Sequence, residues 1–262
     1  MSESEELRIV DEGVVRWIAL CRPASKNGLT IDLNQRIITA VDEAATRAGT
    51  RCVVLSGDGG CFSSGLDLKA AMARGRIDNL DEDLRRYFHG LILAIRRIDK
   101  PVLALVDGAA VGFGCDLALA CDVRVGTERT RFGEIFVKRG LMPDGGGTFS
   151  LQRVVGVGHA LDLLLTGDIV EAEQALALGL ITRQFPSATA IDETWKLAQR
   201  VAAGAPLSHA RIKRAVYGAQ ASTLEAALDV ERRGQVELLK SKDFLEGVSA
   251  FLQKREPQFR GE

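Results

Sequence analysis

Val106-Asp-Gly-Ala-Ala-Val-Gly-Phe-Gly-Cys-Asp-Leu-Ala-Leu-Ala-Cys-Asp122 is the stretch around which this sequence is organised. The apolar run Pro101–Val106 is typical of a buried strand, and small apolar residues from Gly114 to Asp122 predict a closely packed helix. Glycines at such a junction let the backbone approach a ligand, and the first N–H groups of a helix favour negative charge. We therefore expect an anion, or an oxygen that becomes anionic during a reaction, to bind here. A buried helix that uses Gly and Ala only for close packing would have the same sequence.

Composition places the chain among ordinary soluble proteins. Its 262 residues, of which 46% are hydrophobic, fit one large domain or a domain with an appendage. The net charge of −1 favours neither nucleic acid nor an acidic membrane as a partner. The five cysteines and three histidines are scattered without metal-ligand spacing, which predicts no metal site and reduced thiols in the cytoplasm. The acidic start of the chain lacks the features of a targeting peptide.

Strand and helix patterns alternate over the first two-thirds of the chain, and only helices follow, so we expect an α/β core over residues 1–200 and a helical region over 201–262. Asp168-x-x-Glu171 and Ser222-x-x-Glu225 resemble capping boxes that begin helices. Strands are expected at 8–10, 14–20, 52–56, 101–106, 121–125 and 181–185, and a loop that enters a helix is expected at 61–69. Helices are expected at 31–48, 83–98, 114–122, 149–155, 159–165, from the first capping box to 178, and at 192–202, 207–218, 224–239 and 244–254.

Three further motifs join the opening stretch in a fixed order: Arg22-Pro-x-x-x-Asn27, Cys61-Phe-Ser-Ser-Gly-Leu-Asp-Leu68 and Gly140-Leu-Met-Pro-Asp-Gly-Gly-Gly-Thr148. Together they resemble the enoyl-CoA hydratase/isomerase (crotonase) superfamily over nearly the whole chain. The resemblance implies a crotonase-like (ClpP/crotonase) spiral of β-β-α units that carries the active site, followed by a C-terminal helical trimerisation region. It also implies a homotrimer or a dimer of trimers.

The resemblance further implies an acyl-CoA thioester substrate, with coenzyme A as part of the substrate and no tightly bound cofactor. Its thioester oxygen would lie between the backbone N–H groups of Leu66 and Phe113. Two such donors stabilise an enolate, and losing one typically costs about 3 kcal/mol. Phe113 stands where many relatives have glycine, which narrows the pocket.

Substrate contacts follow from the same resemblance. Leu66, Asp67, Leu68 and Lys69 would line the path of adenine and pantetheine, and Arg22 and Lys26 would lie near the phosphates. Phe251 and Lys254 match positions that reach the coenzyme A of a neighbouring subunit. Two of these residues have structural alternatives, because Asp67 could cap a helix and Lys254 could be a solvated surface lysine.

The acid and base groups depart from the hydratase pattern of two glutamates. The first position falls at Asp116, and the second falls at Phe136, which cannot exchange a proton. Glu134 would share the face of Phe136 in an extended segment, but counting back from Gly145 places Phe136 at the site. Asp116 could instead complement the helix dipole as an acid in the first turn.

Asp144, just before the glycine cluster, is the feature that points to isomerisation. Family members with an aspartate there resemble dienoyl-CoA isomerases and ring-epoxide phenylacetyl-CoA isomerases. One carboxylate over an oxyanion hole is enough to move a proton along an acyl chain. An apolar pocket should raise the pKa of Asp144; its expected lining is Phe113, Phe136, Leu141 and Met142. Alternatively, Asp144 only supports the turn after Pro143.

The leading hypothesis is therefore an acyl-CoA double-bond isomerase that uses Asp144. The alternatives are an enoyl-CoA hydratase (a lyase) that uses Asp116 with or without Glu134, a thioester hydrolase or decarboxylase, and a catalytically degenerate CoA-binding member. RNA binding is disfavoured because the sequence has no long basic run. Residues 70–90 are expected to shape the acyl end of the pocket.

Overall fold

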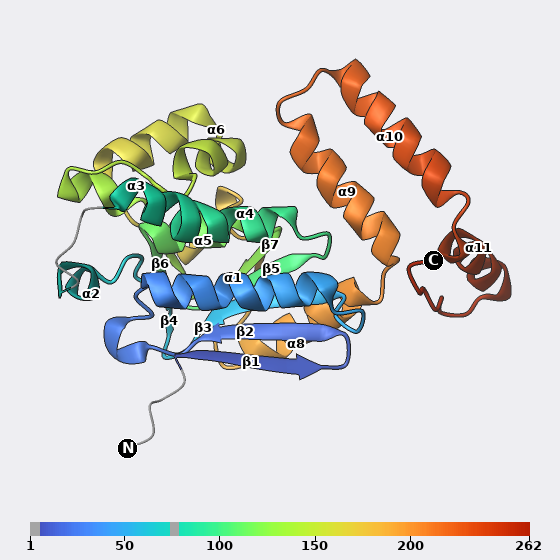
Figure 1. The fold of residues 1–262 in the computed structure, drawn as a ribbon, viewed down its shortest axis with the longest axis horizontal. Coiled ribbons are helices and arrows are strands. Elements are labelled where there is room, and N and C mark those ends of the chain that lie inside the picture. The colour runs from blue at the N-terminus through green and yellow to red at the C-terminus, as the bar shows by residue number, and fades with distance from the viewer. Residues whose placement is uncertain (1–5, 74–78) are drawn as a thin grey trace.

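The fold is built on two sheets in a computed structural model that describes residues 6–73 and 79–262 (Figure 1). The larger sheet has the order β1-β2-β3-β5-β7-β10. Its strands are β1 (Leu7–Glu12), β2 (Val15–Leu20), β3 (Cys52–Gly57), β5 (Val102–Val106), β7 (Val123–Gly126) and β10 (Arg183–Gln184). β1 and β2 form the expected antiparallel hairpin, and the other neighbours are parallel.

The smaller sheet runs β4-β6-β8-β9, with β4 (Cys61–Ser63), β6 (Ala109–Val111), β8 (Arg131–Gly133) and β9 (Val170–Glu171). The chain passes three times from the larger sheet to the smaller one and then into helix, as β3 to β4, β5 to β6 and β7 to β8. This repetition is the expected spiral of β-β-α units. Its second turn ends in α5 (Phe113–Ala120), whose residues are all buried.

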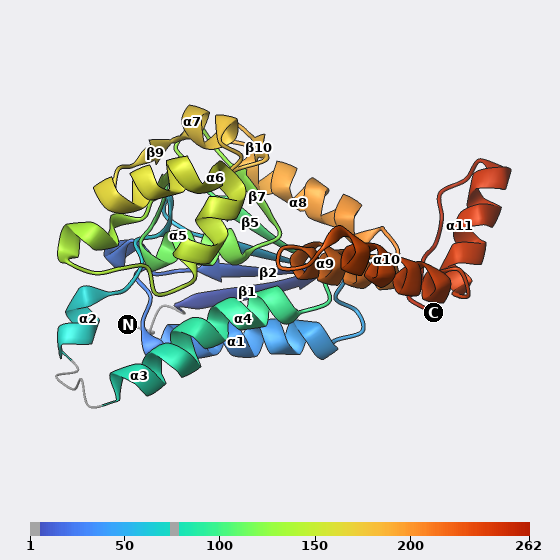
Figure 2. The ribbon, with the colours of Figure 1, turned by 90° about the horizontal axis from the view of Figure 1, so that it is seen from above.

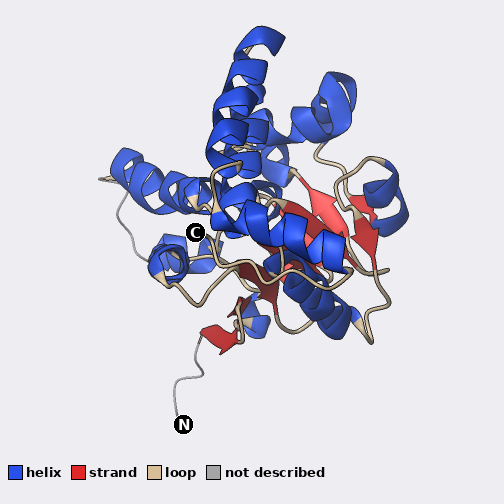
Figure 3. Ribbon diagram, turned by 90° about the vertical axis from the view of Figure 1, so that its right-hand side faces the viewer, coloured by secondary structure: helices blue, strands red, loops and turns tan. Residues whose placement is uncertain are grey.

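Both faces of the larger sheet are covered by helices, and Figure 3 shows helices around most of the strands. Ile18 and Leu20 of β2 face the layer that contains α1 (Ile31–Thr46) and α4 (Gly90–Arg97), whereas Trp17 and Ala19 face α8 (Ala190–Ala202). Successive residues of a strand point to opposite faces. A strand buried on both faces is therefore apolar throughout, which explains the unbroken apolar runs in the sequence.

The last three helices, α9 (Pro206–Ala219), α10 (Leu224–Leu238) and α11 (Lys242–Gln253), extend away from the sheets as an arm (Figures 1 and 2). The expected division near residue 200 falls at the end of α8, which itself packs on the larger sheet. Apolar side chains remain exposed along the arm, at Ile212, Val216, Leu228, Val236, Phe251 and Leu252.

Several local expectations were wrong. Residues 61–63 form β4 rather than a loop, and Glu171 lies in β9, so α7 (Ala172–Ala177) begins without the expected capping box. Thr223, not Ser222, caps α10 by accepting the N–H of Ala226. By contrast, the two helices expected over 149–155 and 159–165 are confirmed, because α6 (Gly147–Thr166) consists of two helical segments joined across a kink at Gly156, whose φ of +81° and ψ of 159° are not helical.

The region expected as one helix over 83–98 contains α3 (Leu80–Asp83), a π-helix over Leu84–His89 and α4. α2 spans Leu68–Ala73, as expected for a loop that enters a helix. Within the described residues, no helix is long and apolar enough to cross a membrane.

Candidate active site

The opening stretch forms β6, a glycine turn and the start of α5. Gly112 has φ +55°, which favours glycine, and its N–H donates to the carbonyl of Gly133. Gly65, on the loop after β4, has φ +81°, and a Cβ there would lie 2.7 Å from the carbonyl oxygen of Val111 and 3.1 Å from the nitrogen of Phe113. The glycines of these two motifs therefore let two distant segments of backbone lie against each other.

This close approach brings together two unused N–H groups, those of Leu66 and Phe113. Leu66 pairs with Leu29 in an isolated parallel bridge, in which Leu29 N–H donates to Gly65 and Asp67 N–H donates to Leu29. The N–H of Leu66 points away from that bridge. Phe113 is the first residue of α5, where an N–H has no helical acceptor. Neither group donates a hydrogen bond within residues 6–73 and 79–262.

One turn into α5, Asp116 lies against the glycine cluster that follows Asp144. The Oδ2 atom of Asp116 accepts the N–H of Gly145 at 3.0 Å. A Cβ on Gly145 would lie 2.6 Å from the Cβ of Asp116, and a Cβ on Gly147 would lie 2.5 Å from its Oδ1 and 2.9 Å from Oε1 of Glu134. Only glycine fits, because the loop packs directly on two carboxyl groups.

The structure thus places Glu134 beside Asp116, although counting along the sequence had favoured Phe136 at that position. Glu134 precedes a 3₁₀ helix, Ile135–Arg139, so it and Phe136 do not share one face of an extended segment as assumed. Glu134 is 3% exposed, and Phe136 packs near Gly112, where a Cβ would lie 4.0 Å from its ring. The available signal was an acid inside the apolar stretch 132–137.

All three carboxyl groups have raised pKa values, chiefly because they are buried. The pKa of Asp116 is raised well above its usual range by burial and then by the negative charges of Glu134 and Asp144. The pKa of Glu134 is raised to about 7, because burial raises it more than a hydrogen bond from the Cys115 thiol lowers it, and the negative charge of Asp144 also raises it. Burial also raises the pKa of Asp144, as expected, while its own backbone N–H and His89 lower it.

The apolar wall beside the carboxyl groups is only partly the expected one. Phe113 is buried and meets Phe88 of the π-helix edge to face, with ring centroids 5.0 Å apart. Leu141 and Met142 do not line the pocket in this chain as expected, since they are 58% and 70% exposed. They lie on the irregular segment after the 3₁₀ helix, and their side chains are exposed among residues 6–73 and 79–262.

Asp67 and Arg22 form an ion pair. Asp67 Oδ1 accepts the N–H of Ala70, and Oδ2 pairs with Arg22 at 3.0 Å. The Ala70 N–H and then Arg22 therefore lower the pKa of Asp67. Arg22 also pairs with Glu6 at 2.7 Å and donates to the carbonyl of Gly28, so its guanidinium is engaged by the protein. A structural role accounts for both residues without a phosphate.

Other predicted contacts are differently placed. Lys26, Leu68 and Lys69 are exposed, and the carbonyl of Lys26 accepts the N–H of Ser64, two residues before Leu66. Asn27 was not expected to have a role of its own. Its buried amide donates to the carbonyls of Asp58 and Cys61, which attaches the Arg22-Pro-x-x-x-Asn27 loop to the end of β3 and to β4.

Phe251 and Lys254 lie at the far end of the arm, and a single chain does not bring them to the carboxyl groups (Figure 2). Phe251 is 82% exposed. Their predicted contact with a neighbouring subunit stays a prediction.

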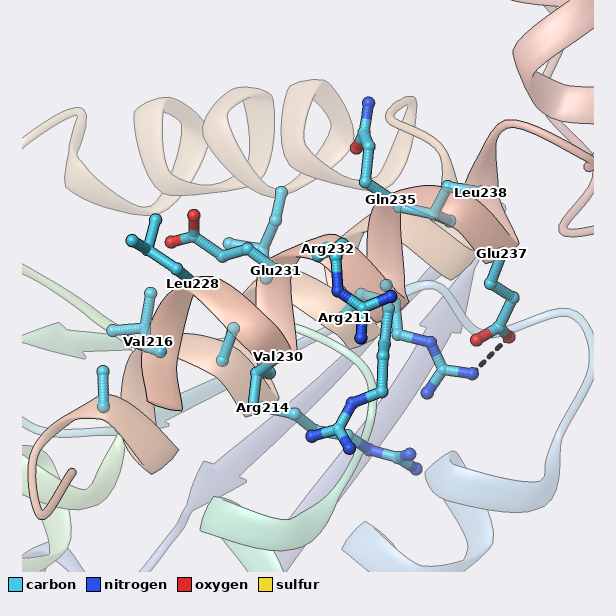
Figure 4. A pocket seen from close by; sticks show the side chains of 16 residues that line it. Arg211, Arg214, Val216, Leu228, Val230, Glu231, Arg232, Gln235, Glu237 and Leu238 are labelled. Atoms are coloured by element: carbon cyan, nitrogen blue, oxygen red, sulfur yellow. Dashed lines mark hydrogen bonds and ion pairs between the residues drawn. The ribbon is translucent and has the colours of Figure 1, made fainter. Parts of the chain in front are cut away.

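A groove of about 1020 Å³ lies between α9 and α10, away from the carboxyl groups (Figure 4). Apolar residues such as Val216 and Leu228 line it together with Arg211 and Arg214. The groove belongs to the arm, so we do not assign it to the site at α5.

Comparisons with known proteins agree on one family. The family model described as enoyl-CoA hydratase/isomerase matches residues 11–262. The chain is 39% identical over 253 residues to a probable enoyl-CoA hydratase of Rhodobacter capsulatus, covering 96% of each protein. It is 34% identical to the 1,2-epoxyphenylacetyl-CoA isomerase of Escherichia coli, covering 96% of this chain and 97% of that protein. The crystal structure of an enoyl-CoA hydratase from Bacillus anthracis superposes with a TM-score of 0.94 at 28% identity, covering 98% of this chain and 100% of that one.

Proposed function

This chain belongs to the enoyl-CoA hydratase/isomerase family, and we propose that it shifts a carbon–carbon double bond in an acyl-CoA thioester. The observation that carries the proposal is that the backbone N–H groups of Leu66 and Phe113 donate no hydrogen bond within the described residues, while Asp144 lies on the loop that packs against α5. Coenzyme A enters as part of the substrate, and the proposal needs no further cofactor. We place the reaction in the cytoplasm.

In the proposed reaction, the thioester oxygen accepts hydrogen bonds from Leu66 and Phe113. The Asp144 carboxylate removes a proton from the acyl chain, and the electrons of that C–H bond form the enolate. The two N–H groups stabilise the developing oxyanion because they are fixed in place before the reaction. Asp144 then returns the proton to another carbon, which leaves the double bond moved and Asp144 ionised again.

Isomerisation is favoured over hydration because Phe136 stands where a hydratase has its second glutamate. A raised pKa suits Asp144 for proton transfer near neutral pH, since an acid-base catalyst works best when its pKa lies near the operating pH. A shift of the double bond needs no water in the pocket.

A hydratase is the second candidate, because Asp116 and Glu134 both flank Gly147. Two carboxyl groups could hold a water molecule between them and deliver its proton. In that case water would add to the double bond, and Asp144 would be secondary.

We also propose that three chains assemble through the arm, and that Phe251 and Lys254 then reach the coenzyme A of a neighbouring subunit. The support is the exposed apolar surface of α9 and α10 together with the groove in Figure 4, which a single chain leaves open. Covering this surface would remove apolar area from water.

The test is a panel of acyl-CoA substrates incubated in deuterated water and followed by product mass. An isomerase moves the double bond, without the mass gain of added water. Addition of water would favour the hydratase, and release of free coenzyme A would show a hydrolase. No turnover of any unsaturated acyl-CoA would contradict the proposed function.

A further inference from the structure

Three buried carboxyl oxygens of Asp116 and Glu134 lack a hydrogen bond of ordinary geometry within residues 6–73 and 79–262, although the N–H of Gly147 lowers the pKa of Asp116 and the thiol of Cys115 lowers that of Glu134. These are Oδ1 of Asp116 and both oxygens of Glu134. The two residues are 1% and 3% exposed, so water does not solvate them freely. A buried polar atom that lacks a hydrogen bond destabilises the folded chain, and it does so more strongly if it is charged.

The unpartnered oxygens face a common point. A Cβ on Gly147 would contact Oδ1 of Asp116 and Oε1 of Glu134 at once, so both oxygens lie around the α-carbon of that glycine. The other oxygen of Asp116 already accepts the N–H of Gly145. Two carboxylates in such a place repel each other, whereas one carboxylic acid and one carboxylate can form a strong O–H···O⁻ hydrogen bond.

We propose that Asp116 and Glu134 share one proton across Gly147 and that this acid pair holds the Gly145–Gly147 loop, and with it Asp144, in position. Glu134 is a positioning residue in this arrangement, since it acts through Asp116 and the loop. The inference rests on the proposed function only for the role of Asp144. The shared proton itself is a property of the free protein.

The surrounding groups are consistent with a single proton. Cys115 on α5 faces Glu134, and Asp144 on the loop before α6 adds negative charge to both members of the pair. His89 on the π-helix lowers the pKa of Asp144. The proposal places the shared proton on the pair and the role of base on Asp144, so the base and the neutral acid are different residues.

Infrared titration of the free protein tests the inference. The wild type should show the C=O band of a protonated carboxyl group at about pH 7, where an ordinary carboxyl group is ionised. Both Asp116→Asn and Glu134→Gln should lose this band, because the remaining carboxylate then accepts a hydrogen bond from the new amide. In each variant, the pH at which the remaining carboxyl group is half ionised should fall by at least about one pH unit. Glu173→Gln, which changes an exposed glutamate of α7, should keep the band.

A band that survives in Glu134→Gln would overturn the proposal, because Asp116 would then be protonated without its partner. A wild type without the band would overturn it as well. If a variant fails to fold, comparing the titration of the wild type with that of Glu173→Gln still shows whether the shared proton is present. If the free protein shows the expected band but the acyl-CoA panel shows no isomerisation, the proposed function is wrong and the acid pair still stands.

The pH profile of kcat separates positioning from packing. In the wild type, kcat should fall as the pH rises through the loss of the shared proton, and in Glu134→Gln this fall should move to lower pH while KM stays similar. An unchanged pH profile in Glu134→Gln would contradict the positioning role.

Discussion

At the scale of single residues, Asp144 is the group on which the proposed chemistry depends. It is half-buried, its Oδ1 has no partner in the described residues, and its raised pKa comes from burial. These are the properties of a base that is exposed to substrate on one side and desolvated on the other.

Asp144→Asn should lower kcat by about 10²–10⁴, because an amide cannot accept the proton that general base catalysis requires. KM for an unsaturated acyl-CoA should change little, since the thioester still binds through backbone N–H groups. Steady-state kinetics measure both quantities. A variant with full activity would remove Asp144 from the mechanism.

The buried Glu134 should make the protein less stable as the pH rises. Its pKa is raised from 4.5 to about 7 in the folded state, so between those pH values the folded chain binds a proton that the unfolded chain has lost. The free energy of unfolding should therefore fall over this range, by on the order of 3 kcal/mol for Glu134.

Urea unfolding of the wild type and of Glu134→Gln at about pH 5 and about pH 8 measures this effect. The variant should lose less stability between the two pH values. Glu173→Gln should follow the wild type, and an equal pH dependence in all three proteins would show that Glu134 titrates normally.

At the scale of elements, the first residue of α6, Gly147, can be tested for the reason it is a glycine. Gly147→Ala should destabilise the protein by about 1–3 kcal/mol, because the added Cβ would meet Asp116 and Glu134. Gly158→Ala, in the same helix with open space around it, should stabilise it by up to about 1 kcal/mol. Thermal or urea unfolding compares the two, and similar effects would mean that the carboxyl contacts do not limit the loop.

Helix α9 is attached to the core through a buried ionic cluster. The ammonium group of Lys213 lies 2.8 Å from Asp122 and also donates to the carbonyls of Ile95 and Lys100. Asp122 follows α5 and also accepts the hydroxyl of Tyr217 at 2.6 Å. The arm is thus fixed to the helix that begins with Phe113.

Lys213→Met should destabilise the protein by about 3–5 kcal/mol, because it leaves the carboxylate of Asp122 buried without its cation. Arg214→Met is the matched control, since Arg214 pairs with Asp99 at the surface and should cost at most about 1 kcal/mol. Denaturant unfolding distinguishes them, and equal losses would show that burial of the pair is not what matters.

At the scale of the whole molecule, the arm carries apolar surface that the chain does not cover. Ile212 and Val216 of α9 are 58% and 57% exposed. A single charged substitution on this surface, Ile212→Glu, should dissociate the proposed trimer, because association would bury the new charge. Light scattering after size exclusion measures the mass. Ile191→Glu, at the start of α8, is an exposed control that should leave the mass unchanged.

The sequence by itself determined the six strands of the larger sheet, most of the helices, the family resemblance and the candidate residues Leu66, Phe113, Asp116 and Asp144. Each of these depends on local periodicity or on a motif contiguous in the chain, such as the glycines at the start of α5. The spiral of β-β-α units followed from the resemblance, and the structure confirms it.

Only the tertiary structure decided which groups meet. Counting back from the glycine cluster favoured Phe136 over Glu134, and counting cannot show that the chain turns into a 3₁₀ helix directly after Glu134. Asp116 and Glu134 are separated by a whole β-β unit and come together only because two glycines let a third segment pack on them. The pKa values of these acids follow from burial and from neighbouring charges, and both are set by contacts between segments distant in sequence.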